Sequence, residues 1–207
     1  MDWQATLDGR SLHLTDKGAT RLSVALDEGG RYRIIVPELA ELKAILAALE
    51  SLPLVGVLPA NGGLLGAKTV SENFALALHF GQEQADDAQD VRDEELQRAL
   101  RLAGLPAARL AGIGREQPMN LTRPERWLLG FARCLVLPPE LLVFDRAFAG
   151  LARREADMVV ACAALYAEYH PFRPVMFIDL DTHELPSVGH CRGELRLSEA
   201  QEAECPC

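Results

Sequence analysis

Short, nearly continuous apolar runs alternate with helical patterns through most of this chain, and this alternation constrains the fold more than any other feature. Runs that are apolar on both faces are typical of parallel strands covered on both sides. The four runs are RYRIIV, LPLVGVL, ELLVFD and PVMFID, at 31–36, 52–58, 140–145 and 174–179. Helical spacing of apolar residues lies between them, at 39–49, 71–80, 92–103, 123–136 and 153–169. The pattern predicts a layered α/β domain.

The amino-terminal part has a different pattern. Alternating runs at 11–15 and 20–27 are followed by the turn sequence Glu28-Gly29-Gly30. This combination predicts an antiparallel β edge beside the parallel sheet.

The domain organisation follows from where these segments fall. With 207 residues, of which 49% are hydrophobic, the chain can bury a full core as one domain. The polar residues 81–95 predict a solvated linker, and Gly104 predicts the end of the helix before it. We expect a single domain over 1–207, made of an α/β core at about 1–80 and 138–190, a small helical subdomain at about 81–137 and a mobile tail at 191–207.

Acidic residues outnumber basic ones, 30 to 21, which gives the chain a net charge of −9. Such a chain repels phosphate backbones and offers no basic surface to nucleic acid or anionic lipid. No apolar run approaches the roughly 18 residues of a spanning helix. The amino terminus, MDWQATLDGR, has neither the basic flank nor the apolar segment of an export signal. We therefore expect a cytoplasmic protein that does not itself span a membrane.

The five cysteines fall into two groups. Cys134 and Cys162 lie within apolar helical patterns, where a reduced, buried thiol is expected, and an odd count argues against a closed set of disulfides. The second group, with one histidine, could hold a soft metal: His190, Cys191, Cys205 and Cys207. Its spacing matches no standard zinc template, so we predict no metal site and keep this cluster as the weaker alternative.

The stretch from 121 to 151 carries several short motifs in a fixed register. Leu121-Thr122 precedes a predicted helix, Ala132-Arg133-Cys134-Leu135 lies near the end of that helix, and the apolar strand Leu141–Asp145 follows. This order resembles the ATP-binding subunits of ABC transporters, from the signature motif through Walker B to the D-loop. The resemblance covers about residues 20–185 and implies a P-loop NTPase-like fold.

Two segments further upstream extend the resemblance. VGVLPANGGLL (55–65) and TVSENFALAL (69–78) look like the Q-loop segment and the following helix, in a form similar to Mla-type phospholipid-trafficking ATPases. The segment 28–46 occupies the place of the strand, P-loop and helix, with Lys43 where the P-loop lysine would be.

The P-loop position has lost the groups that hold phosphate. A P-loop works because glycines let backbone N–H groups wrap around phosphates at a helix amino terminus, while Lys and a Ser or Thr hydroxyl hold phosphate and Mg²⁺. PELAELKA (37–44) contains no glycine, and Ala44 replaces the hydroxyl residue. Glu38 and Glu41 place carboxylates in the first turn, where the helix dipole favours them over an incoming phosphate. Lys43 is then a vestigial ligand or an ordinary surface lysine.

The signature position has changed in the same way. In the family two glycines bring N–H groups against the γ-phosphate held by the opposite subunit of a head-to-tail dimer, but Arg123 and Pro124 stand here. Proline has no N–H to give, and it suits the first turn of a helix. Thr122 with Glu125 three residues later predicts a capping box. Only Arg123 remains as a vestigial contact to nucleotide.

The position of the catalytic carboxylate belongs to Arg146, which stays protonated and cannot act as a base. Asp145 could serve Mg²⁺, but a carboxylate beside Arg146 favours an ion pair. We therefore predict an Asp145–Arg146 ion pair, with Mg²⁺ binding as the alternative.

Three further positions have lost the family's side chain. In this register Ala60 replaces the Q-loop glutamine, Leu180 the switch histidine and Ala152 the terminal aspartate of the D-loop. His183 comes three residues too late to replace the switch histidine unless the loop is rebuilt. The sequence thus predicts a retained fold without retained hydrolysis, no catalytic residues and no required cofactor, although ATP with Mg²⁺ remains possible if the site still binds.

Our first hypothesis is a non-catalytic ABC-type subunit that serves a membrane permease structurally or as a regulator. Such a subunit would lie at the inner membrane through its permease, and the resemblance suggests lipid as the substrate class. A second ABC ATPase subunit is a possible further partner. The resemblance places the permease contact around 61–78, with Asn61, Leu64, Leu65 and Phe74 in the groove.

Two other hypotheses stay open. One is a free-standing regulatory or scaffold protein that uses the fold as an interaction platform. The other is an atypical ATPase that uses Lys43 and Asp145, with His183 as a third candidate.

Overall fold

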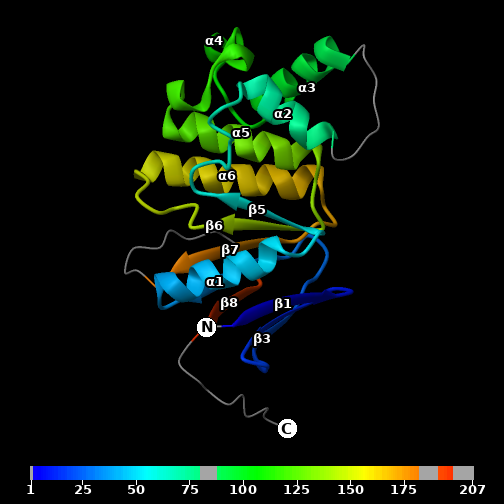
Figure 1. Cartoon of the computed structure of the whole chain (residues 1–207), viewed down its shortest axis with the longest axis vertical. Helices are drawn as coiled ribbons and strands as arrows, with labels where there is room; N and C mark the ends of the chain where they lie inside the picture. Colours follow the sequence, from blue (N-terminus) through cyan, green and yellow to red (C-terminus); the bar gives the residue numbers. More distant parts are fainter. Residues whose placement is uncertain (1, 80–87, 182–190, 198–207) are drawn as a thin grey trace.

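The computed structural model describes residues 2–79, 88–181 and 191–197 (Figure 1). A five-stranded parallel sheet forms its centre, in the order β5-β6-β7-β4-β8. Its strands are β4 (Arg31–Val36), β5 (Val55–Pro59), β6 (Leu141–Asp145), β7 (Val175–Leu180) and β8 (Gly193–Arg196). The α/β architecture predicted from the apolar runs is confirmed. β5 begins three residues later than its apolar run, because residues 51–54 form a turn before the strand.

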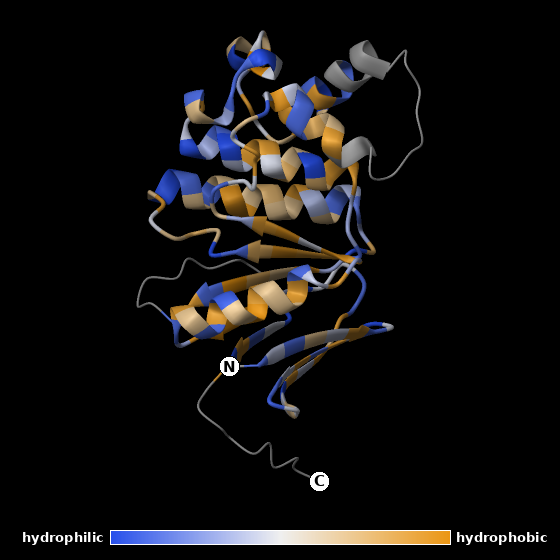
Figure 2. Ribbon diagram, viewed as in Figure 1, coloured by the Kyte–Doolittle hydropathy of each residue, from blue (hydrophilic) through white to orange (hydrophobic). Residues whose placement is uncertain are grey.

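Helices cover both faces of this sheet. On one face α1 (Leu39–Glu50) packs on the sheet together with the small antiparallel sheet, and on the other lie α5 (Arg123–Val136) and α6 (Arg153–Tyr169). Hydrophobic residues dominate the central strands and recur along the helices that cover them (Figure 2). The α5–α6 side has an aromatic core, in which the rings of Phe144 and Phe177 stack with centroids 4.8 Å apart.

The predicted antiparallel edge is present and has three strands: β1 (Trp3–Asp8), β2 (Ser11–Asp16) and β3 (Ala19–Ala25). The sequence analysis did not predict β1. Its alternation is nevertheless regular, since Trp3 and Ala5 are buried against the α1 side of the core.

The helical part contains α2 (Val70–His79), α3 (Ala88–Leu102), α4 (Ala107–Leu110) and the 3-10 turns η1 (Ile113–Arg115) and η2 (Pro118–Asn120). α2 packs against α3 and η1, so it groups with the helices rather than with the α/β core to which we had assigned it. α3 begins at Ala88, within the stretch 81–95 that we predicted to be a linker. Gly104 has a φ of +92° and donates to the Arg101 carbonyl, which confirms the predicted helix end.

The predicted tail differs from the structure at its start. Residues 193–196 form β8, which pairs in parallel with β4 and extends the sheet. His190, Cys205 and Cys207 lie outside the described residues. Among the residues that are described, no group of three metal-ligating side chains occurs.

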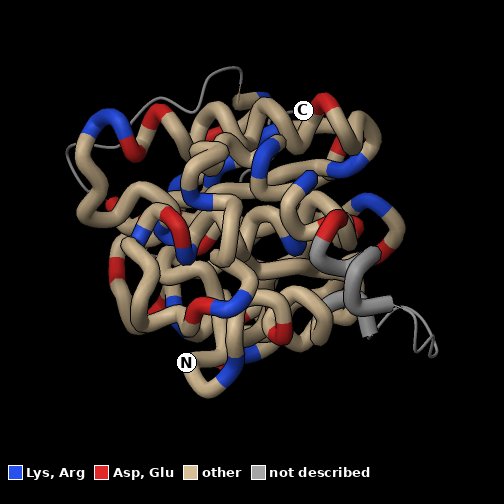
Figure 3. The backbone as a smooth tube through the Cα atoms, turned by 90° about the horizontal axis from the view of Figure 1, so that it is seen from above, with Lys and Arg blue, Asp and Glu red and all other residues tan. Residues whose placement is uncertain are grey.

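The described helices include none that is long and apolar enough to cross a membrane. Basic and acidic residues are interspersed over the described chain, without a basic stripe (Figure 3). The thiols of Cys134 and Cys162 are free, as predicted, and burial raises their pKa values to about 11 and about 12.

Candidate functional site

The carboxyl ends of the parallel strands bring most of the predicted site positions to one edge of the sheet. Strand register pairs Val36 with Leu180, and it pairs Asp145 with both Pro59 and Ile178. Leu180, Asp145, Arg146, Ala60 and the turn into α1 therefore share this edge, as ligand sites of open α/β sheets do. We call it the carboxyl edge.

The turn between β4 and α1 is too short to wrap around a phosphate. β4 ends at Val36 and α1 begins at Leu39, so only Pro37 and Glu38 separate them. Glu38 is the N-cap but accepts no side-chain cap bond. The P-loop motif has six residues before its lysine, whereas four of the six residues between Val36 and Lys43 already belong to α1. A loop that could cradle phosphate is thus missing from the β4–α1 turn.

Lys43 does not lie at the amino terminus of α1. It is the fifth residue of the helix, which places it about 6 Å along the axis from Leu39, and its side chain is exposed. The carboxyl of Glu41 lies in the first turn, where burial raises its pKa above the ordinary value. These positions give Lys43 the setting of a surface lysine.

At the end of β6 the predicted ion pair between Asp145 and Arg146 is confirmed. Arg146 Nε lies 2.7 Å from Asp145 Oδ1, and Nη2 lies 3.2 Å from Oδ2. The Arg146 backbone has a φ of +44°, and its N–H donates to the Ile178 carbonyl. The hydrogen bond to Asp145 raises the pKa of Arg146 further. The carboxylate that could have bound Mg²⁺ is occupied by a guanidinium.

A second ion pair lies beside the first and was missed by the sequence analysis. Arg33 on β4 donates from Nε and Nη2 to Asp179 Oδ2 on β7, at 3.1 and 2.9 Å. The two residues are only 3% and 2% exposed, and the Arg33 guanidinium lies 5.7 Å from the centre of the Phe148 ring. Burial raises the pKa of Asp179, against the opposing effect of Arg33. The sequence did contain a signal for this pair, because Arg33 and Asp179 are charged residues within the apolar runs 31–36 and 174–179.

The residues at the signature position form hydrogen bonds with other residues of the same chain. The capping box of Thr122 and Glu125 is confirmed, with the Thr122 N–H donating to Glu125 Oε2 at 2.8 Å. Arg123 donates from Nη1 to the Gly150 carbonyl at 3.2 Å and from Nη2 to the Ala149 carbonyl. Arg123 therefore ties the start of α5 to the loop after β6 instead of projecting freely toward a nucleotide.

The expected permease-contact residues divide into exposed and buried ones. Leu65 is 54% exposed, Asn61 is exposed and Leu64 is half-buried, so all three can meet a partner. Phe74 is only 2% exposed and belongs to the core, which corrects its assignment to a contact groove.

Asn73, which the sequence analysis did not single out, fixes the loop that presents Leu65. Its side chain is buried and makes hydrogen bonds with the backbone of Leu65, Lys68 and Thr69. A helix-face asparagine gives no distinctive sequence signal, because its partners lie in the preceding loop.

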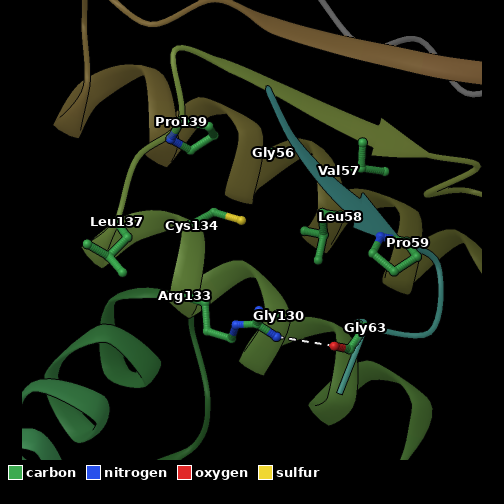
Figure 4. A pocket seen from close by; sticks show the side chains of 11 residues that line it. Gly56, Val57, Leu58, Pro59, Gly63, Gly130, Arg133, Cys134, Leu137 and Pro139 are labelled. Atoms are coloured by element: carbon green, nitrogen blue, oxygen red, sulfur yellow. Dashed lines mark hydrogen bonds between the residues drawn. The ribbon is translucent and has the colours of Figure 1, made fainter. Parts of the chain in front are cut away.

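A cavity of about 210 Å³ lies between β5 and α5, next to this loop (Figure 4). It is lined by Gly56, Val57, Leu58, Pro59, Gly62, Gly63, Gly130, Arg133, Cys134, Leu137 and Pro139. We call it the β5–α5 pocket. The loop approaches α5 so closely that a Cβ at Gly62 would lie 2.1 Å from the Arg126 carbonyl oxygen.

Comparison with solved structures defines the class of fold. A dimeric ABC transporter cassette, MJ0796, matches with a TM-score of 0.60 at 16% identity over 94% of this chain and 91% of that one. An inward-facing metal-chelate type ABC transporter matches with a TM-score of 0.65 at 15% identity over 89% of this chain and 73% of that one. The chain has the α/β, P-loop NTPase-like fold of an ABC ATPase cassette.

A curated protein is similar in sequence to part of the chain. The methionine import ATP-binding protein MetN 2 of Paraburkholderia xenovorans (strain LB400) is 30% identical over 134 residues. This match covers 65% of the chain but only 31% of MetN 2, so it spans less than a third of that protein's length. No protein-family model matches the chain.

Proposed function

We propose that this chain is a non-catalytic ABC-type subunit that docks on a membrane permease and serves it structurally or as a regulator. The observation that carries the proposal is the two-residue turn between β4 and α1. Without a loop that presents several N–H groups, the fold offers little to hold the phosphates of ATP. The ion pair of Asp145 with Arg146 removes the neighbouring carboxylate from metal binding.

The loop after β5 supports docking on a permease. Asn61 and Leu65 are exposed there, while buried Asn73 holds the backbone of the loop in place. An exposed leucine on a fixed loop can bury its apolar surface against a partner. The Mla-like form of residues 55–78 favours lipid as cargo, whereas the name of the MetN 2 relative refers to methionine import. The permease would decide between these cargoes.

Dimerisation with a second, intact ATPase is compatible with this role, but a shared active site is disfavoured. In a head-to-tail dimer the partner's nucleotide would meet Arg123 and Pro124 of this chain. Arg123 is engaged by two carbonyls of its own chain, and proline has no N–H to donate.

Co-purification with a permease tests the proposal. Leu65→Glu should abolish recovery of the permease, because a carboxylate would be buried in an apolar contact. Leu39→Glu is the matched control, since Leu39 is an exposed leucine (42%) at the start of α1. Unchanged recovery with Leu65→Glu would contradict the docking site. Recovery of soluble partners alone would favour the free-standing scaffold instead.

A second candidate function, nucleotide binding, is favoured by the comparisons. MetN 2 is named an ATP-binding protein, and a solved cassette with a TM-score of 0.60 to this chain was bound to ADP and Pi. On this chain Lys43 and Asp145 would have to supply the contacts. A binding measurement with Mg-ATP separates the two candidates.

A further inference from the structure

Four exposed apolar side chains lie at the amino-terminal edge of the central sheet, the end opposite to the carboxyl edge. Leu54 precedes β5, Leu137 follows α5, and Tyr169 and Phe172 lie where α6 leads into β7. Phe172 is 69% exposed, and the other three are between 39% and 53% exposed. We call these four residues the amino-edge patch. Exposed apolar side chains that gather in one region indicate an interaction surface.

Contacts within the chain join the segments that carry this patch. The Leu54 carbonyl accepts a hydrogen bond from the Glu140 N–H at 2.9 Å, and Glu140 forms an ion pair with Arg173. The His170 Nε2 atom lies 2.9 Å from the Leu135 carbonyl oxygen, which ties the end of α6 to the end of α5. The patch therefore belongs to one region of the surface, where α5 and α6 end on the right of Figure 1.

A cavity of about 270 Å³ opens beside Phe172 in this region. It lies between the β1–β2 turn and the segments that lead into β6 and β7, and we call it the amino-edge pocket. Its apolar lining consists of Leu7, Leu26, Leu141, Phe172 and Pro174. Small-molecule sites usually have volumes of roughly 300 to 1,000 Å³, so this smaller hollow is better matched to one large side chain. A mostly exposed aromatic ring and a hollow that can receive such a ring thus lie on the same surface.

The charged residues that line the amino-edge pocket make the surface complementary to itself. Arg10 forms an ion pair with Glu28, and Arg173 forms one with Glu140. These four exposed or partly exposed side chains sum to zero charge, whereas the whole chain carries −9. Two copies of an acidic chain repel each other, so a surface of zero net charge favours their approach. Each arginine can also meet a glutamate of a second copy, whereas a partner with charges of one sign would gain little here.

We propose that the amino-edge patch and pocket bind a second copy of this chain about a two-fold axis. Phe172 of each copy enters the pocket of the other, and Leu54, Leu137 and Tyr169 pack around it. A two-fold interface uses the same surface on both copies, so the inserted ring and the receiving hollow must lie side by side, as they do here. The head-to-tail dimer implied by the family resemblance would instead use the carboxyl edge. That edge and the loop after β5 stay free in the proposed dimer.

Sedimentation equilibrium of the full chain, under reducing conditions and without nucleotide, tests the interface. We expect a reversible equilibrium between one and two chains. Phe172→Glu should raise the dissociation constant at least about thirtyfold, because it places a carboxylate at the aromatic centre of the interface. Met119→Glu is the matched control, since Met119 is 77% exposed in η2, outside the patch, and its change should leave the dimer intact. A wild-type chain that stays monomeric, or a dimer that Phe172→Glu leaves unchanged, would overturn the proposal.

Charge reversal tests the self-complementary part of the interface. Arg10→Glu makes the pocket acidic in both copies and should weaken the dimer several-fold, because like charges then face each other. Adding Glu28→Arg to it restores a net charge of zero and should recover most of the affinity. The thermal midpoint of each variant shows whether the chain remains folded. A dimer that is insensitive to folded Arg10→Glu would contradict the role of charge.

Two further outcomes separate this interface from the carboxyl edge and from permease docking. A dimer that forms only with Mg-ATP would be the head-to-tail dimer and would contradict the amino-edge interface. Phe172→Glu should leave recovery of a permease unchanged, and Leu65→Glu should leave the dimer unchanged. Loss of the dimer in Leu65→Glu would place the contact at the loop after β5 and overturn the proposal.

Discussion

The carboxyl edge and the β5–α5 pocket treat their charged groups in opposite ways. At the carboxyl edge, Arg33 and Arg146 each bind a carboxylate of the same chain, Asp179 and Asp145. In the pocket, Arg133 has only a backbone carbonyl, and exposed leucines lie around it. At the carboxyl edge, where the resemblance predicts the nucleotide, both arginines are therefore already paired with carboxylates of the same chain. The β5–α5 pocket leaves the buried Nε of Arg133 without a hydrogen-bond partner among the described residues.

The largest expected effect concerns the buried ion pair of the carboxyl edge. Arg33→Met leaves the Asp179 carboxylate buried without its cation, which should lower the free energy of unfolding near neutral pH by about 3 to 5 kcal/mol. Urea unfolding measures this loss of free energy. Arg196→Met, which removes the exposed ion pairs with Asp181 and Glu194, should cost far less, because water screens exposed pairs. Equal losses of unfolding free energy for both variants would show that burial does not make the Arg33–Asp179 pair more important than an exposed pair.

The pH dependence of Arg33→Met sharpens the same point. Burial raises the folded-state pKa of Asp179 above its unfolded value, so folding favours the protonated carboxyl. The stability from this group is fully present below the unfolded pKa and is lost as pH rises through the folded pKa. Without Arg33 the folded pKa should rise further. The loss caused by Arg33→Met should therefore shrink on acidification, and a loss that stays constant down to about pH 4 would contradict a buried carboxylate as its cause.

A smaller effect is expected where the docking loop meets α5. Gly62 has a φ of +85°, and its Cβ position is blocked by the Arg126 carbonyl. Gly62→Ala should lower the free energy of unfolding by about 2 to 4 kcal/mol. Gly18 has a φ of +78° but open space around it, so Gly18→Ala should cost only about 1 to 2 kcal/mol. Chemical denaturation of both variants measures how much the close contact with Arg126 adds to the cost of the positive φ. Equal losses of unfolding free energy would mean that the loop can move away from α5.

The smallest expected effect should not distinguish the two regions. Thr122 with Glu125 caps α5 beside the former signature, and Thr69 with Glu72 makes the same contacts at the start of α2 in the docking region. Thr122→Ala and Thr69→Ala should each cost about 1 kcal/mol in thermal or urea unfolding. A much larger loss for Thr122→Ala would show that this threonine does more than cap its helix.

Local chemistry made much of the fold and part of the site predictable. The central strands of the apolar runs, the Thr122 cap and the Asp145–Arg146 pair all depend on residues close in sequence. The Arg33–Asp179 pair does not, because its members meet only when β4 and β7 become neighbours. Strand β8 was missed for a similar reason, since its short GELR sequence gains its partner from β4.

Burial was the other property that the sequence did not determine. Phe74 matched a motif position that we associated with a partner, but α2 turns it into the core of the same chain. Arg133 lay inside a family-like motif and carried no separate signal, because the pocket beside it depends on the close approach of β5 and α5. Contact surfaces need the relative placement of elements, which periodicity alone does not supply.

The most direct test of the central claim is the thermal midpoint of the purified protein with and without millimolar Mg-ATP. A ligand at about 100 times its dissociation constant stabilises the folded state by about 2.7 kcal/mol, which for a chain of this size is a rise of roughly 5 to 11 °C. We predict no shift, because the turn before α1 cannot hold phosphate and Asp145 is bound by Arg146. A rise of that size that Lys43→Ala abolishes would contradict the account and restore nucleotide binding to this fold.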